Sequence, residues 1–152
     1  MTTIDIEQLI PAKPTDVWSA WTTPEGLAAW WWPQRPDTTY DVDVRPGGSY
    51  RIVSEQGAIG VHGTFVTVDE PHLLELTWIW IDEDGDQPED RVRVTFAAVD
   101  EGQTLVTVSH QISAGDDGVE NYRIGWVDVL ERLNAVMRDR HLVTEAASRI
   151  RS

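Results

Sequence analysis

The sequence has no cysteine among its 152 residues and only one lysine, Lys13. The absence of cysteine excludes disulfides, thiolate nucleophiles and thiolate metal ligands, and it suits a reducing compartment. The apolar runs are too short to span a bilayer, and the first ten residues lack the basic start and the apolar stretch of a signal peptide. We therefore expect a cytoplasmic protein that neither enters nor binds a membrane.

Positive charge is also scarce. The 12 basic side chains are outnumbered by 26 acidic ones, which gives a formal net charge of -14. A protein that binds nucleic acid needs a stripe of Lys and Arg to neutralise phosphates, and no segment of this chain provides one. We therefore expect no nucleic-acid partner, and binding to anionic membranes is disfavoured for the same reason.

Nothing in the chain marks a boundary between domains. Internal repeats, low-complexity tracts and linkers are absent, and both the length and the 41% content of hydrophobic residues suit one globular core. We predict a single domain over residues 1–152, in which the tail from about residue 140 either extends a helix or frays.

The N-terminal part of the chain predicts one strand and two short helices. Isoleucines alternate with acidic residues over residues 3–10, a pattern typical of a half-buried strand. Pro14 and Pro24 each suit the first position of a helix, and Thr23 is a good N-cap for the second helix. That second helix is expected to run to Trp30, before Pro33 ends it.

From Tyr40 onward, apolar residues recur at every second position, which is the period of a strand. Pro46-Gly47 fits a tight turn between the first two of these strands. The acidic residues 82–90 are interpreted as a solvated turn. Strands are predicted over residues 40–45, 49–54, 59–68, 74–80, 91–99 and 105–112, and strands joined in series in this way form an antiparallel meander.

The last predicted element is a long amphipathic helix from about Val119 to Met137, with Trp126 and Leu130 on its apolar face. Gly125 lies inside this pattern, so it either permits close packing on the sheet or marks the true start of the helix. The order of elements predicts an α+β, helix-grip fold. In this fold a curved antiparallel sheet of about seven strands surrounds the long C-terminal helix, and two short helices follow the first strand.

Local patterns along nearly the whole chain carry a family resemblance. They are Pro14 to Thr22 with Trp30 and Trp31 behind it, Asp43 to Gly48, Gly63 to Pro71 leading to Leu74 and Trp78, Gly102-Gln103-Thr104 ahead of Val106 to His110, and Gly125-Trp126 with Leu130 and Leu133. In the order and spacing of these patterns the chain resembles the homologues of the activator of heat-shock-protein-90 ATPase, within the START-like or polyketide-cyclase superfamily.

The resemblance implies a hydrophobic cavity or groove between the sheet and the last helix, able to hold a lipid-like, polyketide or other apolar ligand. Members of the family include co-chaperones, cyclase-like proteins and stress-associated domains, so the fold alone does not decide the activity. The family offers no catalytic set that can be placed residue by residue on this chain.

Aromatic residues mark the expected cavity. The chain has eight Trp and only two Phe, and wide rings on a curved sheet leave room for a flat ligand. Since three consecutive indoles cannot all face one core, we expect at least one of Trp30, Trp31 and Trp32 at the surface, as a rim or a partner contact. The predicted ligand-binding residues that line the cavity are Trp32, Tyr50, His62, Phe65, Trp78, Trp80, His110, Tyr122, Trp126 and Leu130.

Two histidines are candidates for polar chemistry in the cavity. His110 is in phase with the inward-facing Val106 and Val108, and His62 lies in the middle of a strand. General acid–base catalysis would require a partner carboxylate, and neither histidine has one adjacent in the sequence. The commoner alternative is a histidine hydrogen-bonded at the edge of the core. The four histidines lack metal-ligand spacing, so we expect neither a metal site nor a cofactor.

Three functions remain open. The favoured one is the binding of a small hydrophobic or aromatic ligand that is lipid-like or polyketide-like. The second is an enzyme of cyclase or hydrolase type, in which His110 or His62, with a Tyr or Arg such as Tyr50 or Arg51, polarises a polyketide-like substrate. The third is an interaction module that modulates a chaperone or another ATPase through the acidic residues 82–90. The sequence is compatible with a monomer and with a homodimer.

Overall fold

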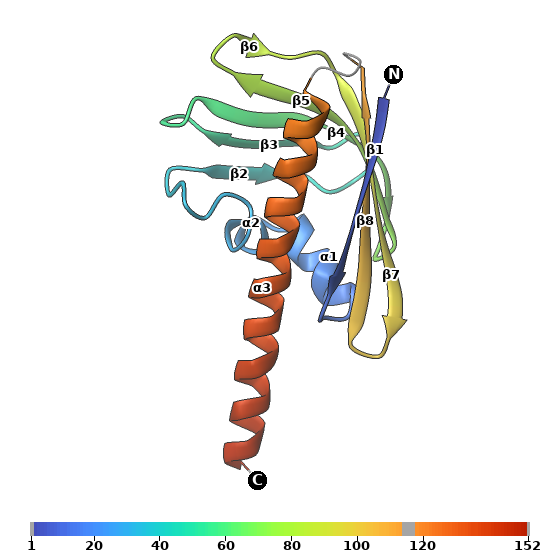
Figure 1. Ribbon diagram of the computed structural model, residues 1–152, viewed down its shortest axis with the longest axis vertical. Coiled ribbons are helices and arrows are strands. Elements are labelled where there is room, and N and C mark those ends of the chain that lie inside the picture. The colour runs from blue at the N-terminus through green and yellow to red at the C-terminus, as the bar shows by residue number, and fades with distance from the viewer. Residues whose placement is uncertain (1, 114–117, 152) are drawn as a thin grey trace.

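The computed structural model describes residues 2–113 and 118–151, and it shows one curved antiparallel sheet that wraps around a long helix (Figure 1). The order of strands across the sheet is β1-β8-β7-β5-β4-β3-β2, and β6 pairs with β5 beside this path. The strands are β1 (Thr2–Ile10), β2 (Thr39–Val42), β3 (Ser49–Ser54), β4 (Ile59–Asp69), β5 (Leu73–Asp82), β6 (Gly85–Asp86), β7 (Asp90–Asp100) and β8 (Gln103–Ile112). The predicted helix-grip fold is confirmed. The strand beyond the predicted seven is β6, which comprises only two residues of the acidic turn.

Three helices complete the described part of the fold. They are α1 (Pro14–Thr22), α2 (Pro24–Ala28) and α3 (Val119–Arg151). Thr23 caps α2 as predicted, since its side-chain oxygen accepts a hydrogen bond of 3.0 Å from the N–H of Gly26. The helix ends at Ala28 rather than at Trp30, because the N–H groups of Ala29 and Trp30 bond to carbonyls only three residues back, as in turns.

The core lies between the concave face of the sheet and one face of α3. Trp126, Leu130, Leu133 and Met137 on α3 are all buried, at the spacing of three and four residues that keeps them on one side of a helix. Inward-facing residues of β7 and β8, such as Val94 and Val108, are completely buried against this face. The far end of α3 extends past the sheet (Figure 1). Among the residues that the structure describes, no helix is both long and apolar enough to cross a membrane.

Candidate functional site

A pocket of about 450 Å³ lies between β5, the turn from β5 to β7 and the first turns of α3. This volume is within the range of roughly 300–1,000 Å³ that is usual for small-molecule sites. Its wall combines residues from five separate parts of the chain: Trp31, Trp32, Trp78, Trp80, Asp82, Gln87, Pro88, Asp90, Ile112, Gly118, Asn121, Tyr122, Gly125, Trp126 and Val129. We call this space the aromatic pocket.

Tryptophan rings from different elements meet around the aromatic pocket. Trp78 and Trp80 occupy alternate positions of β5, and their rings are nearly parallel, with an interplanar angle of 10°. Trp32 meets Trp80 edge to face at 5.8 Å between ring centroids, and Tyr122 of α3 meets Trp80 in the same way at 6.5 Å. Such edge-to-face contacts are favourable arrangements of aromatic rings, and they hold the wall in place without filling the space.

The three consecutive tryptophans differ from the prediction, because none of them is at the surface. Trp30, Trp31 and Trp32 are 0%, 4% and 8% exposed. They occupy turns rather than a helix or a strand, and Trp32 has a positive φ of 55°, so the three rings point in different directions. Trp30 donates its indole N–H to the Ala20 carbonyl at 3.0 Å, whereas Trp31 and Trp32 line the aromatic pocket.

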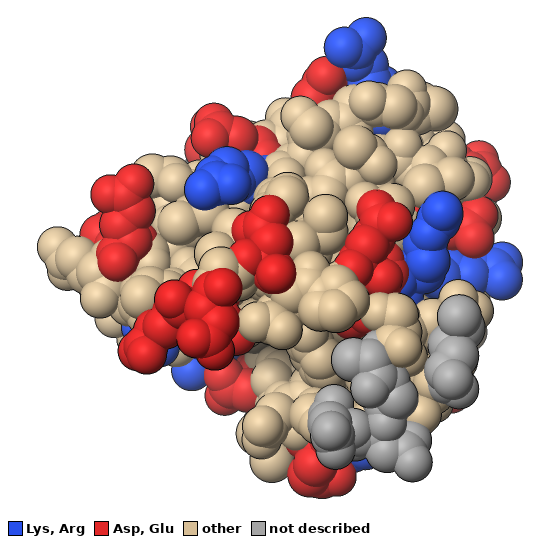
Figure 2. Space-filling model, turned by 90° about the horizontal axis from the view of Figure 1, so that it is seen from above, with Lys and Arg blue, Asp and Glu red and all other residues tan. Residues whose placement is uncertain are grey.

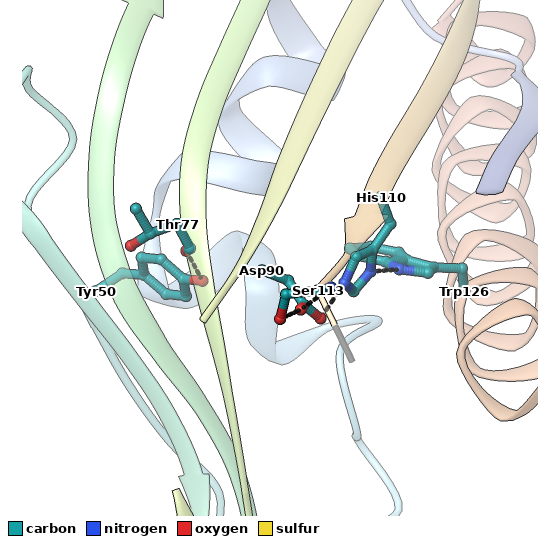
Figure 3. Close-up of polar contacts among 6 residues, drawn as sticks. All are labelled: Tyr50, Thr77, Asp90, His110, Ser113 and Trp126. Carbon is teal, nitrogen blue, oxygen red and sulfur yellow. Dashed lines mark hydrogen bonds and ion pairs between the residues drawn. The ribbon is translucent and has the colours of Figure 1, made fainter. Parts of the chain in front are cut away.

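A smaller space of about 40 Å³ lies deeper in the core. Its wall includes Tyr50 and Phe65 and shares Trp31, Trp78 and Trp126 with the aromatic pocket. The Tyr50 hydroxyl donates a hydrogen bond of 2.7 Å to the Thr77 carbonyl, which fixes the ring against β5 (Figure 3). The space is far smaller than an ordinary ligand site, so the aromatic pocket is the better candidate.

His110 lies directly behind the aromatic pocket and is completely buried. Its Nε2 is 2.8 Å from Asp90 Oδ2, and its Nδ1 is 3.0 Å from the indole nitrogen of Trp126 (Figure 3). Asp90 Oδ1 also accepts hydrogen bonds from the backbone N–H and the hydroxyl of Ser113, at 2.9 and 3.0 Å. The four residues form a connected network that joins β7, β8 and α3.

These contacts determine the tautomer of His110. An indole nitrogen can only donate, so Nδ1 must accept the bond from Trp126 and therefore carries no proton. The proton of the neutral ring then resides on Nε2, which donates to Asp90. Both ring nitrogens are occupied, and His110 is held as a neutral imidazole beside an ionised carboxylate.

The network also affects ionisation nearby. Burial alone would raise the pKa of Asp90, but the hydrogen bonds from His110 and Ser113 outweigh it and lower this pKa below the ordinary value of 3.8. Burial, together with the negative charges of Asp90 and Asp82, raises the pKa of Tyr122 to about 12. Asp90 is thus a carboxylate, and Tyr122 a neutral phenol, over the ordinary pH range.

Neither histidine has a carboxylate adjacent in the sequence, but the fold brings one to each from a distant position. Asp90 was assigned to a solvated acidic turn, but it is 4% exposed and bonds to His110 from 20 positions away. His62 Nε2 lies 3.2 Å from Asp86 Oδ2, outside the pocket and close to solvent. The pairing of β7 with β8 explains this contact. Val92 lies opposite His110, and Asp90 is two residues from Val92 on the same face of the sheet. A prediction of this hairpin register would have found the pair.

The structure brings together most, but not all, of the predicted cavity residues. Trp32, Trp78, Trp80, Tyr122 and Trp126 line the aromatic pocket, and Tyr50 and Phe65 line only the smaller space.

His62, His110 and Leu130 line neither space. Leu130 is completely buried in the core, because it lies one helical turn beyond Trp126 and faces the sheet. Trp31 was expected only as part of a segment near the mouth of the cavity, and Asp82, Asp90 and Gly125 are among the wall residues that were not predicted.

Gly125 serves neither of the two purposes considered from the sequence. The helix begins at Val119, and a β-carbon at residue 125 would find no atom within 4 Å, so no close packing requires the glycine. Gly125 is exposed and lies on the pocket wall, where the missing side chain leaves open space.

Two buried donors of the pocket wall have no hydrogen-bond partner among the residues that the structure describes. They are the indole N–H groups of Trp31 and Trp78, whose residues are 4% and 5% exposed. A third such group, that of Trp21, lies by the smaller space. A buried donor without a partner costs about 1–3 kcal/mol. Among the described residues, no group of three His, Cys, Asp or Glu is placed to hold a metal ion.

A curved sheet that grips a helix, with a pocket between the two, defines a START-like, helix-grip protein. Residues 11–138 match the family model described as Activator of Hsp90 ATPase homolog 1-like protein. The chain belongs to this family, as the resemblance in its sequence indicated. No curated protein sequence matches the chain.

Solved structures share the fold at low sequence identity. DynU16, from the dynemicin biosynthetic locus, is 21% identical with a TM-score of 0.75; the match covers 90% of this chain and 47% of DynU16, so the chain spans about half the length of that protein. PFC0360w, an HSP90 activator from Plasmodium falciparum, is 20% identical with a TM-score of 0.67 over 88% of this chain and 94% of the other. The Aha1 dimer from Colwellia psychrerythraea is 19% identical with a TM-score of 0.73 over 90% and 96%.

Proposed function

We propose that the protein binds a small, largely aromatic or otherwise apolar molecule, lipid-like or polyketide-like, in the aromatic pocket. The observation that carries this proposal is the wall itself. Five tryptophans and a tyrosine surround about 450 Å³ of space instead of closing upon it. Aromatic rings contribute much of the binding energy at such sites, because each ring buries a large apolar area.

The unpartnered indole groups specify the ligand further. Trp31 and Trp78 each hold a buried N–H donor at the pocket wall without an acceptor. A ligand with a carbonyl, ether or hydroxyl oxygen would supply the acceptor and recover about 1–3 kcal/mol for each bond made. The proposed ligand is therefore a flat apolar body that carries oxygen acceptors.

The arrangement around His110 favours binding over acid–base catalysis. A general base must reach the proton that it removes, and both nitrogens of His110 are already bonded to Asp90 and Trp126. His62 has a carboxylate partner in Asp86, but neither residue lines the pocket. We therefore favour ligand binding over an enzyme of cyclase or hydrolase type.

A protein partner is the second candidate, and the acidic turn supports it. Glu83, Asp84, Asp86 and Glu89 are exposed in the turn between β5 and β7. Figure 2 shows acidic side chains at several places over this end of the molecule and basic side chains at fewer. A chaperone or another ATPase with a basic face would bind here in a salt-dependent manner, and a charge-neutral turn would weaken that binding. Family membership and the similarity to an HSP90 activator make this candidate worth testing.

Native mass spectrometry beside a denatured control tests the proposal first, because it detects a small molecule that copurifies. Titration of tryptophan fluorescence with fatty acids, flavonoids and polycyclic aromatic ketones follows. Trp80→Phe alters the pocket wall, and Trp18→Phe is the matched control, since Trp18 is buried but lines neither space. We expect saturable quenching that Trp80→Phe weakens and Trp18→Phe preserves. A protein without a bound molecule that responds to no compound would overturn the proposal.

A further inference from the structure

We propose that the ligand of the aromatic pocket is an organic cation, a quaternary ammonium or protonated amine attached to an apolar body. This inference rests on the proposed function and adds the charge of the ligand to it. It is drawn from three features of the pocket wall: carboxylates without a cationic partner, the absence of basic side chains and a surround of aromatic rings.

The first feature is the uncompensated charge of Asp90. All its described hydrogen bonds come from neutral groups, namely the Nε2–H of His110 and the N–H and hydroxyl of Ser113. His110 is neutral because Trp126 donates to its Nδ1. These bonds solvate the carboxylate but leave one full negative charge in a residue that is 4% exposed and lines the pocket. A buried charge of this kind is stabilised most by an opposite charge nearby.

A second carboxylate on the same wall repeats this arrangement. The oxygens of Asp82 accept hydrogen bonds from the side-chain amide of Gln87, at 3.0 and 3.1 Å, and from the backbone N–H of Asp84. These donors are neutral as well. Two carboxylates therefore line the pocket, and none of the described groups that donate hydrogen bonds to them carries a positive charge.

Within the described part of the pocket wall, no basic residue balances these charges. None of the described residues that line it is Lys, Arg or His. The basic residue next to Asp90 in the sequence, Arg91, is exposed on the opposite face of the sheet, where it lines a separate polar hollow with Arg93. Strand geometry dictates this separation, since successive side chains point to opposite faces.

The aromatic wall is the third feature. The faces of indole and phenol rings attract cations, and Trp is the most effective of these side chains. The rings of Trp32 and Tyr122 stand almost perpendicular to that of Trp80, at 86° and 85°. A cation in the pocket would thus meet rings in several orientations, together with two carboxylates. The same carboxylates would repel an anion.

Three probes that share one ring system test the charge. They are (naphthalen-2-ylmethyl)trimethylammonium, its uncharged carbon isostere 2-neopentylnaphthalene, and naphthalen-2-ylmethanesulfonate, each titrated against the full chain with tryptophan fluorescence and checked by calorimetry. We expect the cation to bind about tenfold more tightly than the isostere, and the sulfonate to bind weakest. Equal binding of all three would overturn the inference but leave the proposed function intact. Binding of none would overturn both.

Matched variants show whether the carboxylates cause the preference. Asp90→Asn and Asp82→Asn each remove a charge from the wall, while Asp84→Asn makes the same change at an exposed residue of the turn that does not line the pocket. We expect the first two to reduce the preference for the cation about three- to tenfold, and the third to preserve it. Because Asp82 is half-buried, its variant provides the test even if Asp90→Asn does not fold. A preference unchanged in every one of these two variants that folds would contradict the inference.

Discussion

Gly125 and Gly118 allow the same substitution to be tested in two backbone conformations. Both residues line the aromatic pocket, and a β-carbon added at either would find no atom within 4 Å. They differ in one respect, because Gly118 has a φ of +82° whereas Gly125 lies in regular helix. Replacement by alanine therefore measures helix propensity at Gly125 and backbone strain at Gly118, in both cases without new packing contacts.

We predict opposite effects on stability. In a helix interior alanine is favoured over glycine by about 1 kcal/mol, so Gly125→Ala raises the free energy of unfolding by about that amount. For a chain of this size the Tm rises by roughly 2–4 °C. At a positive φ an L-residue with a β-carbon costs about 1–2 kcal/mol, which exceeds the gain from a stiffer unfolded chain, so Gly118→Ala lowers the free energy of unfolding by about 1 kcal/mol.

Urea unfolding followed by tryptophan fluorescence measures both variants, and scanning calorimetry gives their Tm values. Similar slopes of unfolding free energy against urea would show that the substitutions leave the unfolded state comparable. A Gly125→Ala variant with an unchanged or lower Tm would refute the reasoning, since it would reveal a hidden contact at the pocket wall. Shifts of equal sign in the two variants would refute the role assigned to φ.

Three further predictions concern the network and the tyrosines. Because the pKa of Asp90 is lowered in the fold, its carboxylate stabilises the protein above the ordinary value of 3.8, and this stabilisation is lost as the pH falls through the folded pKa. In urea unfolding, wild type should be about 2 kcal/mol more stable than Asp90→Asn at neutral pH, and this difference should narrow below about pH 4. A difference that does not change with pH would contradict the prediction. Nitrogen NMR should find the proton of His110 on Nε2, whereas a proton on Nδ1 would refute the bond from Trp126. Burial raises the pKa of all three tyrosines, that of Tyr122 to about 12. Ultraviolet titration of the native protein should therefore lack the absorbance change near pH 10 that ionising tyrosines produce in urea. Such a change in the native protein would show that a tyrosine is solvated.

Local sequence patterns were enough to predict the fold. Alternation of apolar residues predicted the long strands to within a few residues, because a strand with one buried face must repeat every two positions. The cap at Thr23 and the apolar face of α3 follow equally local rules. The two-residue strand β6 was missed, since a bridge this short has no pattern of its own.

The site depends on contacts that local patterns do not contain. Asp90 and His110 lie 20 positions apart, and only the hairpin register brings them together. Trp126 then decides the tautomer from a third element. The burial of Trp30, Trp31 and Trp32 depended on backbone turns, including the positive φ of Trp32, that composition does not reveal. Aromatic richness indicated a cavity, but not which rings surround it.

The place of β1 at the edge of the sheet affects how the chain can fold during synthesis. β1 precedes the other described strands in the sequence, yet its partner is β8, with Thr2 opposite Ile112 and Ile10 opposite Thr104. The paired residues of β1 and β8 lie 94 to 110 positions apart, so residues 2–10 cannot form these pairs until β8 has been translated. Contacts so distant in sequence also slow folding, because a long loop has to close before they form. Pairing of β1 is thus among the last steps of folding, and until then its backbone groups and alternating isoleucines are exposed to other chains.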